Sequence, residues 1–169
     1  MPRAIVLPAA LLLGGCVFAA QETADQPVVA RSTMAKFEAA KDLPDCVSIA
    51  PARGNPSNGP SAIFLKAESN CIVPYHWHTA NESLVPLLGL LQVTVHGERP
   101  KVVANGDYAY MPAQRVHMAK CASSKPCTVI LQLDAAMDMH YVDKDGEEIS
   151  AEAALASVNQ PVTKSAPKP

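Results

Sequence analysis

Three histidines and one glutamate have the residue types and the spacing that a metal site requires. His76 and His78 stand two residues apart, Glu82 follows four residues later, and His117 lies further along the chain. Residues 72–75 favour a β-strand, in which side chains two positions apart point to the same face. Both imidazoles of the pair would then point the same way, and Glu82 could fold back toward them after a short turn. Neutral imidazoles and a carboxylate that converge on one point are ligands for a divalent transition metal.

The elements that must position these side chains are short strands. Brief apolar stretches alternate with turns rich in Gly and Pro, a pattern that favours an all-β sandwich or barrel over βαβ units. Pro86 lies inside one of these stretches and predicts an edge or a bulge, because proline donates no ladder hydrogen bond. The expected strands are 46–50, 62–67, 72–78, 83–88, 90–96, 101–103, 108–111, 115–121, 128–133 and 139–142.

The spacing of the candidate ligands resembles the two sequence motifs of the cupin superfamily. The first motif has His-x-His, then Glu after three residues and Gly after six more; the second has Gly, five residues, Pro, and a His five places later. The matching positions are His76, His78, Glu82 and Gly89, then Gly106, Pro112 and His117. The resemblance covers roughly residues 46–143. It implies a double-stranded β-helix, the cupin jelly-roll barrel, with the three His and the Glu holding a metal in its mouth.

Three positions depart from the usual cupin pattern. Asn70 and Gln114 stand where glycine is usual, and Cys121 stands where asparagine is usual. None of the three is a ligand, so the departures concern loop shape and not the metal. Asn also tolerates a positive φ angle.

The resemblance leaves the reaction open. Cupins with this ligand set include dioxygenases, oxalate-type decarboxylases and sugar isomerases, and neither fold nor ligands choose among them. An open coordination position would let a metal polarise a carbonyl, bind O2 or activate water, and Glu82 could be a ligand or a catalytic base. We expect an oxygenase-like, metal-dependent oxidoreductase that acts on a small organic substrate. The alternatives are a protein that binds metal or a small ligand for sensing or delivery, and a metal that only stiffens the barrel.

Several metals suit three imidazoles and a carboxylate. The usual order of affinity favours Cu and Zn, and Fe(II) is hard to retain under oxidising conditions. We therefore rank Zn, Mn and Cu ahead of Fe and Ni.

Other side chains are candidates for contact with a ligand. Arg115 could recognise an anionic group, and Tyr110 and His140 could also contact a substrate. His96 precedes a turn and is expected to face solvent. The apolar wall of the cavity is expected to include Leu65, Val85, Leu87, Leu91, Val93, Val116, Met118, Ile130 and Leu133.

The N-terminus predicts export to the periplasm or cell envelope. Residues 1–20 combine an early positive charge, an apolar run and small residues, which is typical of a secretory signal peptide. Two cleavage sites compete. A lipobox-like Leu-Gly-Gly-Cys would make Cys16 a lipidated N-terminus and the only link to a membrane, whereas a small-x-small site ending at Ala19 would release a soluble protein.

The four remaining cysteines predict two disulfides. An even number of cysteines in an oxidising compartment suggests pairing, and four cysteines allow three connectivities. Cys121 and Cys127 flank a turn-forming loop and are expected to pair, which leaves Cys46 with Cys71.

Length and charge agree with one modest domain. The chain has 169 residues with 14 basic and 16 acidic side chains and shows no basic cluster, which argues against nucleic acid as a partner. A homodimer is possible by the resemblance to cupins. The expected segments are a flexible leader or N-terminal arm at 21–45, a barrel at 46–143 with a loop at 51–60, a turn and a helix capped by Ser150 at 144–159, and a disordered tail at 160–169. Within the leader, residues 31–45 are expected to hold either a short helix at 34–40 or an arm that packs on the barrel.

Overall fold

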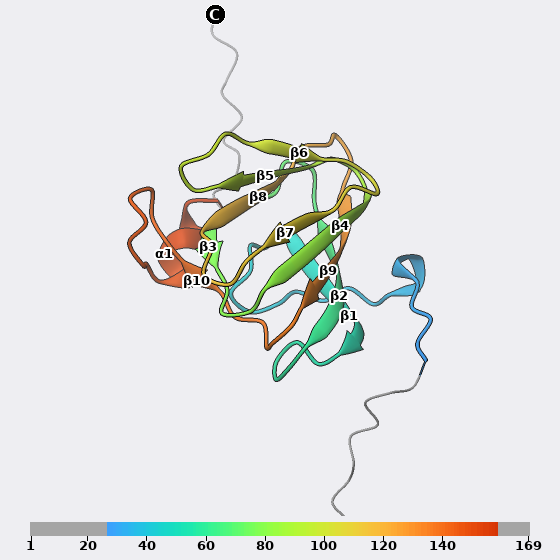
Figure 1. The fold of residues 1–169 in the computed structure, drawn as a ribbon. Helices are drawn as coiled ribbons and strands as arrows, with labels where there is room; N and C mark the ends of the chain where they lie inside the picture. The colour runs from blue at the N-terminus through green and yellow to red at the C-terminus, as the bar shows by residue number, and fades with distance from the viewer. Residues whose placement is uncertain (1–26, 159–169) are drawn as a thin grey trace, which may run out of the picture.

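Two antiparallel β-sheets face each other in the computed structural model, which describes residues 27–158 (Figure 1). One sheet has the strand order β1-β2-β9-β4-β7 and the other has the order β10-β3-β8-β5-β6. From β2 onward the chain passes repeatedly from one sheet to the other, as a double-stranded β-helix requires. The strands are β1 (Val47–Gly54), β2 (Ser61–Ala67), β3 (Ile72–Trp77), β4 (Glu82–Leu88), β5 (Leu91–Val95), β6 (Lys101–Val103), β7 (Ala109–Met111), β8 (His117–Cys121), β9 (Cys127–Leu133) and β10 (His140–Tyr141).

The all-β prediction is therefore confirmed, and the strands fall close to their expected positions. The largest difference is at β1, which continues through residues 51–54, a stretch predicted to be loop. β1 is an edge strand and its pairing with β2 is irregular between Pro51 and Arg53. An edge position with a bulge tolerates proline, which explains why Pro51 does not end the strand.

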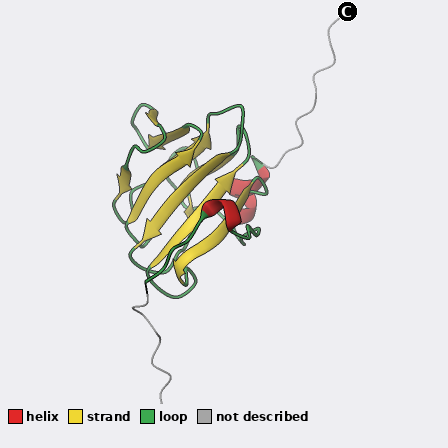
Figure 2. Ribbon diagram, turned by 90° about the vertical axis from the view of Figure 1, so that its right-hand side faces the viewer, coloured by secondary structure: helices red, strands yellow, loops and turns green. Residues whose placement is uncertain are grey.

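The helical segments are short and lie outside the strands (Figure 2). Of the two alternatives for residues 31–45, the helix at 34–40 does not form and an arm packs on the barrel: a single 3-10 turn, η1, spans Ser32–Met34, and the backbone of Glu38 pairs with Ile49. The N–H of Glu38 donates to the Ile49 carbonyl at 2.9 Å, and the reverse bond has the same length. Pairing with the edge of β1 thus overrides the weak helical preference of a short segment.

The C-terminal helix forms where the sequence predicts it. α1 spans Ala151–Ala156, and the hydroxyl of Ser150 accepts a hydrogen bond from the backbone N–H of Ala153. No helix within residues 27–158 is long and apolar enough to cross a membrane. The predicted signal peptide, Cys16, the start of the leader and the tail at 160–169 lie outside the described residues.

Pro86 lies at a β-bulge inside its sheet, one of the two predicted arrangements. β4 pairs with β9 on one side and β7 on the other, and its pairing with β9 shifts between Pro86 and Leu88. The carbonyl of Pro86 still accepts a hydrogen bond from the N–H of Gly106 at 3.0 Å.

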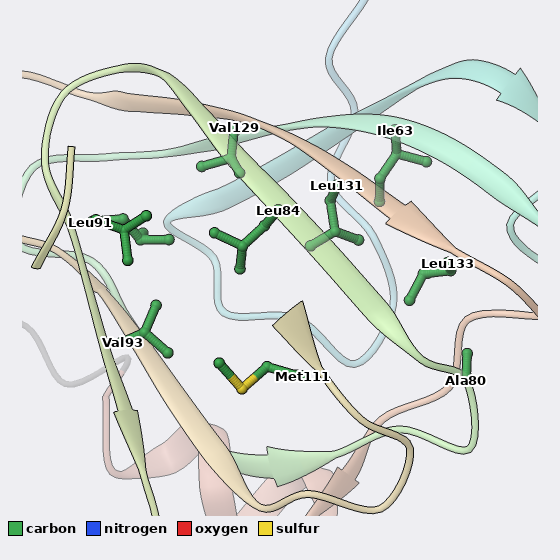
Figure 3. Close-up of a cluster of buried hydrophobic side chains, with 10 residues drawn as sticks. Ile63, Ala80, Leu84, Leu91, Val93, Met111, Val129, Leu131 and Leu133 are labelled. Carbon is green, nitrogen blue, oxygen red and sulfur yellow. The ribbon is translucent and has the colours of Figure 1, made fainter. Parts of the chain in front are cut away.

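The core lies between the two sheets. Side chains from both sheets point into this space (Figure 3), where Ile63, Leu84, Leu91, Val93 and Leu131 belong to one buried cluster. Because side chains alternate along a strand, one inward position determines its neighbours two residues away.

This alternation corrects the predicted cavity wall. Leu65, Leu91 and Val93 line the interior, and Leu133 is buried in the same core. The other predicted residues do not line the interior: Val85, Leu87, Val116, Met118 and Ile130. Three of them, Val85, Met118 and Ile130, each lie one position away from a lining residue on the same strand and so face the opposite side.

Both disulfides have the predicted pairing and close the same end of the barrel. Cys46 is bonded to Cys71, and Cys121 is bonded to Cys127. Cys46 and Cys71 directly precede β1 and β3, and Cys121 and Cys127 lie in β8 and β9, so each bond connects one sheet with the other. The N–H of Cys121 also donates to the carbonyl of Cys71 at 2.9 Å, so the two disulfides lie side by side.

Candidate metal centre

The four candidate ligands meet at the opposite ends of β3 and β8 from the disulfides. His76 lies in β3 directly opposite His117, the first residue of β8. His78 follows β3, and Glu82 is the first residue of β4 in the facing sheet. One donor atom from each of the four residues lies within 4.8 Å of the others, and all four side chains are buried. The structure therefore brings together the ligand set that the sequence predicts.

The hydrogen bonds of the three histidines decide which ring nitrogen faces the site. In each ring Nδ1 lies within hydrogen-bond distance of a backbone carbonyl oxygen. A carbonyl can only accept, so each Nδ1 carries the proton and donates, and each Nε2 keeps its lone pair. His76 donates to the carbonyl of Pro74 at 2.7 Å, His117 to that of Arg115 at 2.8 Å, and His78 to that of Asp138.

Glu82 then has a buried oxygen without a donor. Its Oε2 lies 3.2 Å from Nε2 of His78 and 3.1 Å from Nε2 of His117, but in this tautomer all three atoms are acceptors. Oε2 accordingly makes no hydrogen bond, although only 4 % of Glu82 is exposed. A buried carboxylate without a partner is costly, and a cation at this point would satisfy every one of these lone pairs. The residues therefore fit a divalent metal.

When no cation is bound, a proton can take its place between Glu82 and the histidines. The pKa values of these side chains show that the site favours positive charge. Burial would raise the pKa of Glu82, but rings of His117 and His78 that carry a proton on Nε2 would donate to the carboxylate, and this outweighs burial and holds the pKa of Glu82 well below its usual range. Burial would lower the pKa of His78, but its contact with Glu82 raises the pKa overall. Burial, reinforced by repulsion from the other two rings, lowers the pKa of His76. The pocket is thus built to hold positive charge beside Glu82.

The turn between His78 and Glu82 is held by the segment that follows β9, residues 134–139, which we call the strap. Asp138 accepts two hydrogen bonds from Thr79, one from the backbone N–H at 2.9 Å and one from the hydroxyl at 2.6 Å. Asp134 accepts two from Asn81 in the same way, at 2.8 and 2.6 Å. Neither aspartate is predictable from the sequence, because nothing in the local pattern indicates contact with a turn more than 50 residues away.

Two of the departures from the cupin pattern are explained by backbone geometry. Asn70 and Gln114 both have φ of 62°, the left-handed conformation that the usual glycine would supply. The backbone N–H of Gln114 donates to the carbonyl of His78 at 2.8 Å, so this strained turn also supports a ligand. Gly89 of the first motif lies against the Cys121–Cys127 disulfide, where an added Cβ would come within 2.8 Å of Cys127 Sγ.

The three residues predicted to contact a substrate lie apart from the ligands. The guanidinium of Arg115 is exposed and lies 2.9 Å from Glu98. The hydroxyl of Tyr110 donates to the side-chain oxygen of Asn81 at 3.0 Å. His140 stacks on Trp77, with ring centroids 3.8 Å apart. None of the three lines the interior cavity, and their role in substrate binding stays a prediction. His96 is exposed, as expected.

A small cavity of about 60 Å³ lies inside the barrel beside the ligands. Apolar side chains from both sheets line it, among them Leu84 and Leu131 from one sheet and Leu91 and Val93 from the other (Figure 3). Apart from the four ligands, Lys120 is the one titratable residue among the described residues that line it. The cavity can therefore hold a small apolar group close to the metal site.

Comparisons with known proteins agree with the fold and the motif. Residues 66–133 match the family model of the cupin domain. No curated protein matches the sequence. The polyketide cyclase RemF from Streptomyces resistomycificus is similar in structure, with a TM-score of 0.60 and 14% identity over 70% of this chain and 87% of that one.

Two further solved structures show the same fold. An RmlC-like cupin from Shewanella frigidimarina has a TM-score of 0.53 and 17% identity, over 64% of this chain and 91% of that one. The DMSP lyase DddQ from Ruegeria pomeroyi has a TM-score of 0.54 and 16% identity, over 73% and 75% of the respective chains. Likenesses at these identities concern the fold alone.

The fold and site define a class of protein, a two-sheet β-barrel with a buried His3Glu group at one end. Residues 66–133 of this chain match the cupin domain, as the motif spacing predicts, and the fold is the one that many cupin structures share.

Proposed function

We propose that this cupin is an exported, metal-dependent oxidoreductase, oxygenase-like, that acts on a small organic molecule. The observation that carries this proposal is the composition of the cavity. Its described lining has no titratable side chain other than the four ligands and Lys120, so there is little material for acid-base chemistry away from the metal. A reaction in this space would depend on a metal, which would supply Lewis acidity or redox chemistry when bound.

The chain's own residues have distinct roles in this proposal. The three histidines present Nε2 lone pairs because their Nδ1 protons are held by backbone carbonyls. Glu82 supplies the negative charge, and it could also accept a proton from a substrate. The apolar wall excludes water and orients the rest of the molecule. We keep Zn, Mn and Cu ahead of Fe and Ni as the expected metals.

A binding protein without turnover is the second candidate. The same scarcity of acid-base groups favours it, since a cavity of this kind could hold a metal and a small ligand without changing either. Under both candidates we propose a periplasmic or cell-envelope location, attached to the membrane only if Cys16 is lipidated. A homodimer remains a proposal as well.

The experiment that tests the metal is elemental analysis of exported protein purified without a metal-affinity tag. We expect about one equivalent of a single metal per chain. The double variant His76→Ala, His78→Ala should lose it while keeping both disulfides, and His96→Ala, an exposed histidine outside the site, should keep it. Wild-type protein without metal, even after soaking and washing, would refute the proposal.

Turnover separates the two candidate functions. Metal-loaded protein would be supplied with small organic molecules while oxygen consumption and product formation are followed. Turnover that disappears in His78→Ala supports the enzyme. Tight binding of a ligand without any product would instead identify a binding protein.

A further inference from the structure

We propose that the interior cavity accepts a small uncharged molecule with one polar group at the metal end and an apolar body of only a few carbon atoms. This inference rests on the proposed function, because it names the class of ligand for the same site. Three features of the cavity carry it: its wall, its volume and its closed far end.

The wall selects an apolar body. The side chains that face the cavity beyond the ligands include Ile63, Leu65, Leu84, Val93 and Leu131. In Figure 3 the labelled members of this group from the two sheets point toward a shared interior. A charged or strongly polar group placed among them would lose its hydration without gaining a partner, which is costly.

The ligands leave room for one polar group. Every histidine Nδ1 at the site already donates to a backbone carbonyl, so these protons are not available to a bound molecule. One polar group could interact with the metal or with Glu82. Apart from Lys120, the wall beyond the ligands is apolar, so a second polar group placed away from Lys120 would remain unsatisfied.

The volume limits the size of the molecule. At about 60 Å³ the cavity is smaller than the apolar cavity of roughly 150 Å³ that binds benzene in an engineered protein. A molecule such as 1-butanol, with five non-hydrogen atoms, matches this space.

The far end of the cavity is closed by rigid groups. Cys71 and Cys121, one from each disulfide, line that end together with Leu43. Met137 of the strap lines the cavity and packs against the cluster that includes Leu84 and Leu131, and its N–H donates to the carbonyl of Pro56 at 2.7 Å. Met139 also lines the cavity, but it packs against the cluster that contains the disulfide cysteines. A longer molecule would therefore meet the disulfides at the far end of the cavity.

The test is a titration of the full exported protein, both metal-free and metal-loaded, with three probes: 1-butanol, 1-octanol and succinate. Methyl NMR signals of the cavity leucines and valines report binding. We expect 1-butanol to shift these signals in a saturable way, and 1-octanol and succinate to leave them unchanged. Binding of succinate or 1-octanol at least as strong as that of 1-butanol would overturn the proposal, and so would the absence of any 1-butanol binding in both forms.

Two neighbouring residues of β9 provide a matched pair of variants. Leu131 faces the cavity and Ile130 faces the other side of the sheet. Leu131→Phe should weaken 1-butanol binding by about tenfold or more, because it occupies the space of the alkyl chain, whereas Ile130→Phe should not change it. Leu131→Ala, which enlarges the cavity, should extend binding to 1-hexanol. Equal effects of the two phenylalanine variants would contradict the proposal.

The metal-free arm separates this inference from the proposed function. If 1-butanol binds as expected but the protein takes up no metal, the proposed function fails and the cavity assignment stands. If metal binds and turnover occurs but 1-butanol never enters, the assignment of ligand class fails alone.

Discussion

Removing the carboxylate of Asp138 should weaken metal binding, although this carboxylate is not a metal ligand. It accepts hydrogen bonds from the backbone and the hydroxyl of Thr79, and its oxygen lies 3.2 Å from Nε2 of His140. The backbone carbonyl of the same residue holds Nδ1 of His78. In Asp138→Ala the carbonyl remains, but the contacts that fix its position are lost.

The expected size of the effect follows from these contacts. Three hydrogen bonds to a carboxylate that is one-third exposed contribute at the low end of the usual range, so the fold should lose about 1–2 kcal/mol. Mutation of a residue that holds a metal-ligating histidine in place typically lowers metal affinity by roughly 10- to 100-fold, which is about 1.4–2.7 kcal/mol. We expect the zinc affinity of Asp138→Ala to fall within that range.

Asp134 is the matched control. It holds Asn81 through two hydrogen bonds of nearly the same lengths, on the same strap, but it has no described contact with a ligand histidine. Zinc affinity is measured by competition with a chelator, and the visible spectrum of the Co(II) form reports ligand geometry. Asp134→Ala should keep both near wild type, and Asp138→Asn should recover part of the loss. Equal zinc affinities for the two alanine variants would refute the positioning role of Asp138.

Three further predictions concern the site and the barrel. The pKa of His78 is raised above the ordinary histidine value of 6.5, so its protonation stabilises the metal-free fold below pH 6.5, and this contribution is lost as the pH rises through the raised pKa. Because a metal must displace the proton on His78, zinc affinity should fall as the pH drops. A chelator titration that shows no pH dependence would contradict this. The double variant Cys121→Ala, Cys127→Ala should lose about 2 kcal/mol in denaturant unfolding, because its short loop no longer restricts the unfolded chain, yet it should still bind zinc. Gln114→Gly should raise the free energy of unfolding by up to about 1 kcal/mol, because glycine adopts the positive φ of this position without strain. Gly106→Ala should lower the free energy of unfolding by about 1 kcal/mol in the same assay, because Gly106 has φ of 86° although the space around it is open. A loss of stability in Gln114→Gly would show that the Gln114 side chain itself stabilises the fold.

The ligand set could be predicted from the sequence because its spacing reflects simple local geometry. Two histidines separated by one residue share a face of a strand, and a glutamate four positions on can return to them after a turn. The disulfide pairing of Cys121 with Cys127 is local in the same sense, since only a short loop separates the two residues.

The face that each strand presents to the cavity was less predictable, although part of the signal was present. Since Glu82 points inward, Leu84 must do so too and Val85 cannot, and the same alternation from His117 places Met118 outside. On β9, which carries no ligand, only pairing with β2 and β4 decides that Leu131 and not Ile130 faces the interior.

The sequence by itself determined the short strands, the candidate metal ligands and the cysteine pairing, because each depends on residues close together in the chain or on an established motif. The tertiary structure alone decided that the strap holds the ligand turn, that Glu38 pairs with β1 instead of joining a helix, and that Arg115, Tyr110 and His140 lie apart from the cavity. These features depend on contacts between segments distant in the chain, and no local pattern of residues encodes such contacts.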